Sequence, residues 1–72
     1  MDKWKQKAKT IIKSELAKQD IDYPQLVVLL EKISIKEDNI NLANKINRGT
    51  FSFIFVLQIF KVLKIKNLRL ED

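Results

Sequence analysis

The sequence contains neither cysteine nor histidine. The absence of cysteine excludes disulfides and thiolate metal sites. The absence of histidine removes the commonest general base and the commonest metal ligand. No segment approaches the roughly 18 uninterrupted apolar residues of a membrane span, and no apolar signal core follows the lysines at the N-terminus. We therefore expect a cytoplasmic protein with no cofactor and no contact with a membrane.

Glycine and proline each occur only once in 72 residues. Because glycine and proline interrupt helices, their scarcity in a chain rich in Leu, Ile, Lys and Glu favours helices with short connections. An apolar fraction of 46% is too high for a disordered chain. The sequence thus predicts one all-α domain of four to five helices over residues 1–72. Such a small domain buries only about 60% of its unfolded surface, so a partner subunit would help to stabilise it.

Periodicity and capping signals predict where the helices begin and end. The first helix carries a stripe of apolar residues that we expect to be buried, with lysines on the other faces of the helix. The second begins at Asp22, which forms a capping box with Gln25. Asp38 and Ser52 are the expected caps of the third and fourth helices. The predicted helices are residues 3–18, 23–33, 39–47 and 53–64, and the expected buried faces are Trp4, Ala8, Ile11, Ile12 and Leu16 in the first and Leu26, Leu29, Leu30 and Ile33 in the second.

Three apolar features lie outside this simple pattern. Ile35 is alone in the connection 34–38, where it is expected to reach the core and hold the turn. Helix 53–64 is apolar nearly all round, which fits either a central core helix or a helix that also forms a dimer interface. The tail 66–72 alternates Leu68 and Leu70 with polar residues, as in a short strand or an extended segment whose leucines pack on the domain.

The third helix, residues 39–47, carries the most informative pattern. Four polar residues fall at i, i+3, i+4 and i+7, within an arc of roughly 100°. Leu42, Ala43 and Ile46 point the opposite way. The helix stops at the only glycine, Gly49, where a left-handed residue closes a helix. Asn is a poor helix former, so helical propensity does not explain its use here. The four polar residues are Asn41, Asn44, Lys45 and Arg48.

These side chains are suited to DNA. Asn pairs with the N6 and N7 edge of adenine, which suits Asn41 and Asn44, while Lys45 and Arg48 offer donors to phosphate or guanine. Asn39 completes the candidate site. The net charge of +5 permits attraction to a polyanion, although it also serves solubility. The alternative is a solvated helix face on which Lys45 and Arg48 balance the helix dipole.

The order of these parts resembles the helix-turn-helix of the lambda-repressor and Cro-like family. A capped helix with an inner leucine (Asp22 to Leu26) is followed by an apolar residue in the turn (Ile35). A recognition helix then ends in Ile46-Asn-Arg-Gly49, before an apolar helix. The resemblance covers about residues 21–65, and the first helix fits the family's first helix. It implies that helix 39–47 reads the major groove of double-stranded DNA.

A more specific resemblance is to a small, little-characterised group of bacterial domains. They share an Asn-Lys-x-x-Arg-Gly-x-Phe-Ser run, followed by a Leu-Gln-containing apolar helix and a Leu-Arg-Leu-like tail. In this chain the run is Asn44-Lys-Ile-Asn-Arg-Gly-Thr-Phe-Ser52, followed by Leu57-Gln58 and Leu68-Arg-Leu70. This resemblance supports the fold and assigns no activity. Two features depart from a standard helix-turn-helix: the 34–38 connection is several residues longer, and Val27 stands where Ala is common.

The sequence therefore predicts a sequence-specific DNA-binding protein, a small bacterial transcriptional regulator. It would act as a homodimer through helix 53–64 and tail 66–72, with two recognition helices one duplex turn apart. The alternative is a protein-interaction or antitoxin-like module that keeps the fold without reading DNA. We do not expect an enzyme, because the carboxylates lie at helix starts and turns and no phosphate loop or nucleophile motif is present.

Overall fold

The computed structural model describes residues 2–68 and residue 70. It contains four helices, α1 (Lys3–Lys18), α2 (Tyr23–Glu31), α3 (Asn39–Arg48) and α4 (Phe53–Leu63), and no strand among the described residues. The predicted all-α class is confirmed. The first helix has the predicted bounds, α2 ends two residues before the predicted end, α3 continues one residue further, and α4 ends one residue earlier.

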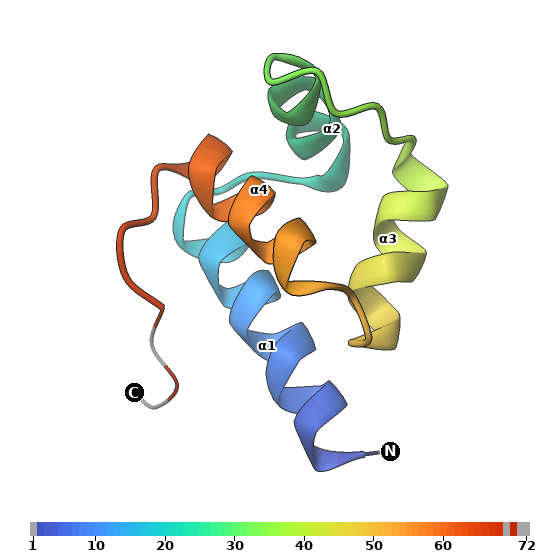
Figure 1. The fold of residues 1–72 in the computed structure, drawn as a ribbon, viewed down its shortest axis with the longest axis vertical. Helices are drawn as coiled ribbons and strands as arrows, with labels where there is room; N and C mark the ends of the chain where they lie inside the picture. Colours follow the sequence, from blue (N-terminus) through green and yellow to red (C-terminus); the bar gives the residue numbers. More distant parts are fainter. Residues whose placement is uncertain (1, 69, 71–72) are drawn as a thin grey trace.

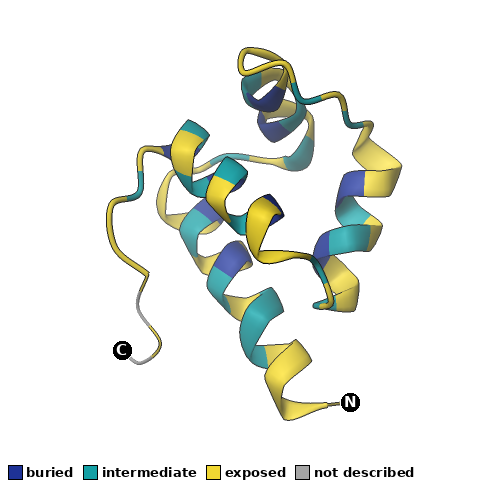
Figure 2. Cartoon of the chain, viewed as in Figure 1, coloured by how far each residue is buried: buried dark blue, intermediate teal, exposed yellow. Residues whose placement is uncertain are grey.

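The helices surround one small core, with α3 at an edge of the molecule (Figure 1). Helix α3 packs against α1 and α2, and α2 also packs against α4. Every helix contributes buried residues spaced four apart, which places them on one face of that helix. Figure 2 shows these buried positions turned inward on all four helices. The core consists of Ile12, Leu16, Leu26, Leu30, Leu42, Ile46, Phe55, Ile59 and Leu63.

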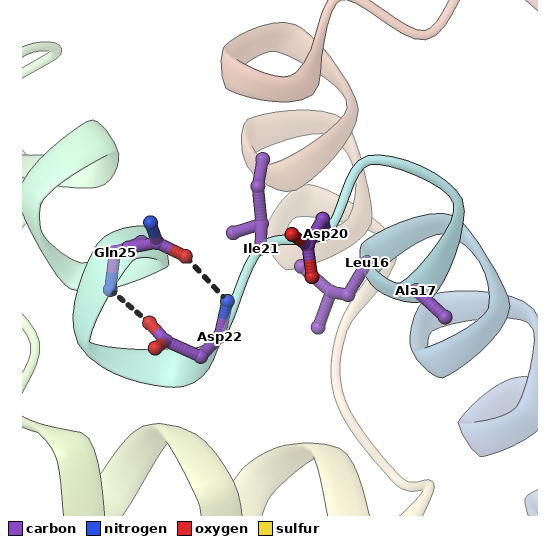
Figure 3. A pocket seen from close by; sticks show the side chains of 6 residues that line it. All are labelled: Leu16, Ala17, Asp20, Ile21, Asp22 and Gln25. Carbon is purple, nitrogen blue, oxygen red and sulfur yellow. Dashed lines mark hydrogen bonds between the residues drawn. The ribbon is translucent and has the colours of Figure 1, made fainter.

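Each helix begins at a side chain that accepts hydrogen bonds from free backbone N–H groups. The predicted capping box is present. The backbone N–H of Gln25 donates to Asp22 Oδ1, and the backbone N–H of Asp22 donates to Gln25 Oε1, both at 2.9 Å (Figure 3). The predicted caps Asp38 and Ser52 accept from the backbone of α3 and α4. Asp2 caps α1 in the same way. These local bonds satisfy donors that the first turn leaves free.

Each helix is also followed by a residue whose backbone adopts the left-handed conformation. Gly49 (φ +70°) occupies this position after α3, and Asp20, Ser34 and Lys64 occupy it after the other helices, with φ between +54° and +65°. The residue after each of these three is an isoleucine, and its amide donates to the carbonyl five residues earlier. Ile35 is one of these isoleucines and is half-buried against the core, as predicted.

Two residues expected in the core are exposed. Trp4 is 76% exposed: the buried residues of α1, Ile12 and Leu16, lie in its C-terminal half, and its N-terminus projects from the domain (Figure 1). Ile33 is 37% exposed, because α2 ends at Glu31 and the following turn carries Ile33 off the buried face.

The chain after α4 runs along the outside of the domain without helix or strand up to residue 68. Leu68 and Leu70 are 46% and 62% exposed, so they do not pack tightly on the domain. Residues 69, 71 and 72 of the predicted tail lie outside the described residues. Taken singly, none of the helices described is long and apolar enough to cross a membrane. Helices α3 and α4 reach the required length and apolarity only together, across a bend of 118°.

The shared helix ending predicts opposite effects for two glycine exchanges. Ser34→Gly removes the strain of a left-handed L-residue and should raise the free energy of unfolding by up to about 1 kcal/mol. Gly49→Ala adds strain, and its Cβ would lie 2.9 Å from the carbonyl carbon of Lys5, so it should cost roughly 2–4 kcal/mol. Urea denaturation of both variants measures the two changes. Equal effects of the same sign would contradict this reading of the helix ends.

Candidate nucleic-acid interface

The exposed side of α3 is a row of polar side chains with one apolar member. Leu42 and Ile46 are fully buried, and the opposite side carries five exposed residues. Among the residues that the structure describes, Asn44, Asn47 and Arg48 make no side-chain hydrogen bond or ion pair. Their donors and acceptors are therefore available to a ligand. The exposed side, called the outer face below, consists of Ile40, Asn41, Asn44, Asn47 and Arg48.

Asn41 is partly committed at the start of the helix. Its backbone amide donates to Asp38 Oδ1 and its side-chain Nδ2 donates to Asp38 Oδ2, both at 2.8 Å. The carbonyl oxygen of its side chain keeps its acceptor capacity. Asn39 is exposed too, but at 100° per residue it lies about 140° around the helix from Asn44. The structure thus groups Asn41, Asn44 and Arg48 and leaves Asn39 on another side.

Lys45 serves a contact inside the domain. Its Nζ donates to Glu37 Oε2 in the connection before α3 and lies 4.8 Å from the centroid of the Phe55 ring of α4. The Glu37 side chain is only 10% exposed, so its carboxylate depends on this cation. The attraction of an ammonium to an aromatic face adds to the pairing. Lys45 therefore ties the connection, α3 and α4 together.

Phe51 extends this contact into the loop after α3. Its ring centroid lies 5.6 Å from that of Phe55, with the planes tilted by 53°, a favourable arrangement for an aromatic pair. We call Glu37, Lys45, Phe51 and Phe55 the Lys45 cluster. It fixes the segments on both sides of α3, so the orientation of the outer face is set by tertiary contacts.

The C-terminal end of α3 rests on the backbone of α1. A Cβ at Gly49 would collide with the Lys5 carbonyl oxygen and lie 3.0 Å from the Lys5 Cα. The predicted left-handed ending at Gly49 is confirmed. Glycine is needed there for two reasons: the left-handed backbone and the close approach of Lys5. The contact also places the exposed Lys5 beside the end of α3 that carries Arg48.

Charge is unevenly distributed along α3. Glu37 and Asp38 stand at its N-terminus, and both carboxylates are engaged, by Lys45 and by the cap. Arg48 and Lys5 are at its C-terminus. This order agrees with the helix dipole. It leaves the uncompensated positive charge at the C-terminal end of the outer face.

Two outer-face residues were missed by the sequence reasoning. Asn47 lies three residues after Asn44 and so shares its side of the helix, a signal that the sequence already held. Ile40 is 74% exposed. It lies two residues before the buried Leu42, about 200° around the helix, so its helical spacing already placed it on the outer side.

The surface has two other notable features. One is an open hollow between the end of α1 and the start of α2, where the Asp22 carboxylate is already used by the capping box (Figure 3). Beside it, burial raises the pKa of the Tyr23 phenol. The second is an apolar groove between α4 and the following segment, lined by Phe53, Leu57, Phe60, Ile65 and Leu68 among others. Within the described residues, no cluster of three His, Cys, Asp or Glu residues could hold a metal.

Fold and surface together define a small all-helical domain with a polar, partly basic outer face and no metal cluster among the residues described. The chain belongs to the family described as a domain of unknown function (DUF6471), whose model matches residues 4–68. No curated protein and no solved structure matches the chain. The predicted likeness to an uncharacterised family agrees with this finding.

The Lys45 cluster predicts a structural role for a residue that resembles a DNA contact. Lys45→Ala leaves the Glu37 carboxylate unpaired and should lower the free energy of unfolding by roughly 1–3 kcal/mol, the cost of an unsatisfied, nearly buried charged group. Lys18→Ala is a matched control: its partner Glu15 is 3.6 Å away and Lys18 is 63% exposed, so the loss should stay under about 0.5 kcal/mol. Thermal unfolding measures both. Unchanged stability of Lys45→Ala would contradict the role of the cluster.

Proposed function

We propose that this domain binds double-stranded DNA in a sequence-specific manner, with the outer face of α3 in the major groove. The observation that carries the proposal is the outer face itself, where the amides of Asn44 and Asn47 and the guanidinium of Arg48 are exposed and make no hydrogen bond or ion pair within the described chain. These groups match the hydrogen-bonding edges of adenine and guanine. Asn44 is assigned to a base edge, and Arg48 to guanine or to a phosphate.

The arrangement of α2 and α3 supports a helix-turn-helix of the lambda-repressor and Cro-like kind. Helix α2 is capped, Ile35 packs inward from the connection, and α3 packs against α2. The connection from Lys32 to Asp38 is longer than the usual turn of three to four residues. The Glu37–Lys45 pair anchors its last residues, so the extra length does not leave α3 loose.

Lys45 acts in this proposal as a positioning residue, because its ammonium is engaged by Glu37 and Phe55. The basic contribution to phosphate binding then comes from Arg48 and from Lys5, which meets the same end of α3. Asn41 offers its free carbonyl oxygen, and Asn39 lies off the reading side.

We further propose that two copies associate through α4, as a regulator that reads two half-sites requires. Phe53, Ile54 and Leu57 are 67%, 66% and 53% exposed and share one side of α4. The apolar groove reaches from this side to Leu68. Contiguous exposed apolar surface of this kind marks an interaction site. A two-fold contact lets the same surface cover itself in both copies.

The same α4 surface favours the second candidate function, a protein-interaction or antitoxin-like module that does not read DNA. In that case another protein covers Phe53, Ile54 and Leu57, and Arg48 only balances the helix dipole. The two functions differ in whether the outer face of α3 takes part in binding.

DNA binding predicts a steep loss of affinity with salt. Affinity for mixed-sequence duplex DNA should fall with a log–log slope of about −0.9 for each phosphate neutralised. Arg48→Ala should weaken binding and, where Arg48 contacts a phosphate, make the slope shallower by about one. Fluorescence anisotropy over a salt series measures both quantities.

The control removes the same charge elsewhere. Lys18 is at the other end of α1 from Lys5, about 20 Å away along the helix axis, so Lys18→Ala should reduce affinity much less than Arg48→Ala. Absence of binding by the folded protein at low salt would refute the proposal. Equal losses in the two variants would show a non-specific charge effect.

The dimer proposal predicts that one charge on α4 separates the copies. Leu57→Asp places a carboxylate in the centre of the exposed apolar side and should convert a dimer to a folded monomer, because Leu57 is not part of the core. Val28→Asp on α2 is the control, since Val28 is 56% exposed and lies outside this surface. Light scattering after size exclusion gives the masses. A monomeric wild-type protein at high micromolar concentration would contradict the proposal.

A further inference from the structure

Ile40 is a large apolar side chain in the first turn of α3, and it is 74% exposed. The other large apolar residues of α3, Leu42 and Ile46, are fully buried. The remaining outer-face residues are three asparagines and an arginine. Exposure of an isoleucine in such surroundings gives the free domain no packing energy. A ligand with a small apolar group among polar ones would match this surface.

A protein-docking surface is a poor match for this position, because such surfaces present contiguous apolar area. The exposed apolar side of α4 has that character, whereas Ile40 stands alone among amides. The major groove offers the required mixture, since thymine presents a C5-methyl group beside the hydrogen-bonding edges of neighbouring bases. In docked helix-turn-helix domains the first residues of the recognition helix contact base edges.

We propose that Ile40 is a specificity-determining residue that packs on the C5-methyl group of a thymine. The inference rests on the proposed DNA binding and names part of the site that is read. Ile40 and Asn44 are one turn apart on the same side of α3, about 6 Å along its axis. Base pairs are about 3.4 Å apart. The thymine read by Ile40 thus lies within about two base pairs of the adenine read by Asn44.

The test isolates the methyl group. A duplex is first selected from random sequence by the wild-type protein, and each thymine is then replaced, one at a time, by deoxyuridine, which lacks only the C5-methyl. Wild-type protein should lose about fourfold in affinity at one position, the factor expected from burying one methyl-sized group. Ile40→Ala should bind the thymine and uracil duplexes equally at that position. Ile40→Val should keep most of the difference.

Val28→Ala is the matched control, because it shortens another exposed β-branched residue, on α2, and should leave the thymine preference intact. Circular dichroism should show Ile40→Ala to be as stable as wild type, since Ile40 is outside the core. If the wild-type protein selects DNA and prefers thymine at one position, but Ile40→Ala keeps the same preference, this inference is overturned and DNA binding stands. Failure to select any duplex would refute the proposed function and the inference with it.

Discussion

The structure depends most on one close approach, that of Gly49 to the backbone of Lys5. A side chain at residue 49 would push the end of α3 away from α1, on which it rests. The same residue must also adopt a left-handed backbone to end the helix. Because both demands fall on one residue, the C-terminus of α3 has a fixed place. The basic end of the outer face, with Arg48 and the nearby Lys5, follows from that contact.

A second set of contacts, the Lys45 cluster, ties α3 to the connection before it and to α4 after it. Lys45 reaches back to Glu37 and across to Phe55, and so joins the long connection to α4 through one side chain. Leu42 and Ile46 anchor the inner side of α3 in the core, opposite the outer face. A helix held this way keeps its remaining side chains in a constant arrangement, which recognition of a regular duplex requires. In the proposed function, the cluster and Gly49 position α3 while Ile40, Asn44 and Arg48 make the contacts.

The sequence predicts those features that depend on neighbours within one helical turn. The capping box at Asp22, the cap at Asp38 and the left-handed ending at Gly49 follow from residues at most three positions away. What it could not predict depends on distant partners. Lys45 has the spacing of a DNA contact, and only the fold brings Glu37 and Phe55 to it. Trp4 has the spacing of a core residue, but the fold leaves its side chain exposed. Ile40 lies about 200° around the helix from the buried Leu42, so its spacing already places it on the outer side, and the fold adds that nothing in the domain covers it.

The central claim is that the outer face of α3 is the surface that meets DNA. The most direct measurement is a titration of ¹⁵N-labelled protein with a mixed-sequence duplex at low salt, followed by two-dimensional NMR. The account predicts that the side-chain amides of Asn44 and Asn47 and the backbone amides of residues 40–48 shift most, and that resonances of the exposed side of α4 shift far less. Shifts confined to Phe53, Ile54 and Leu57, or no shifts at all, would contradict it.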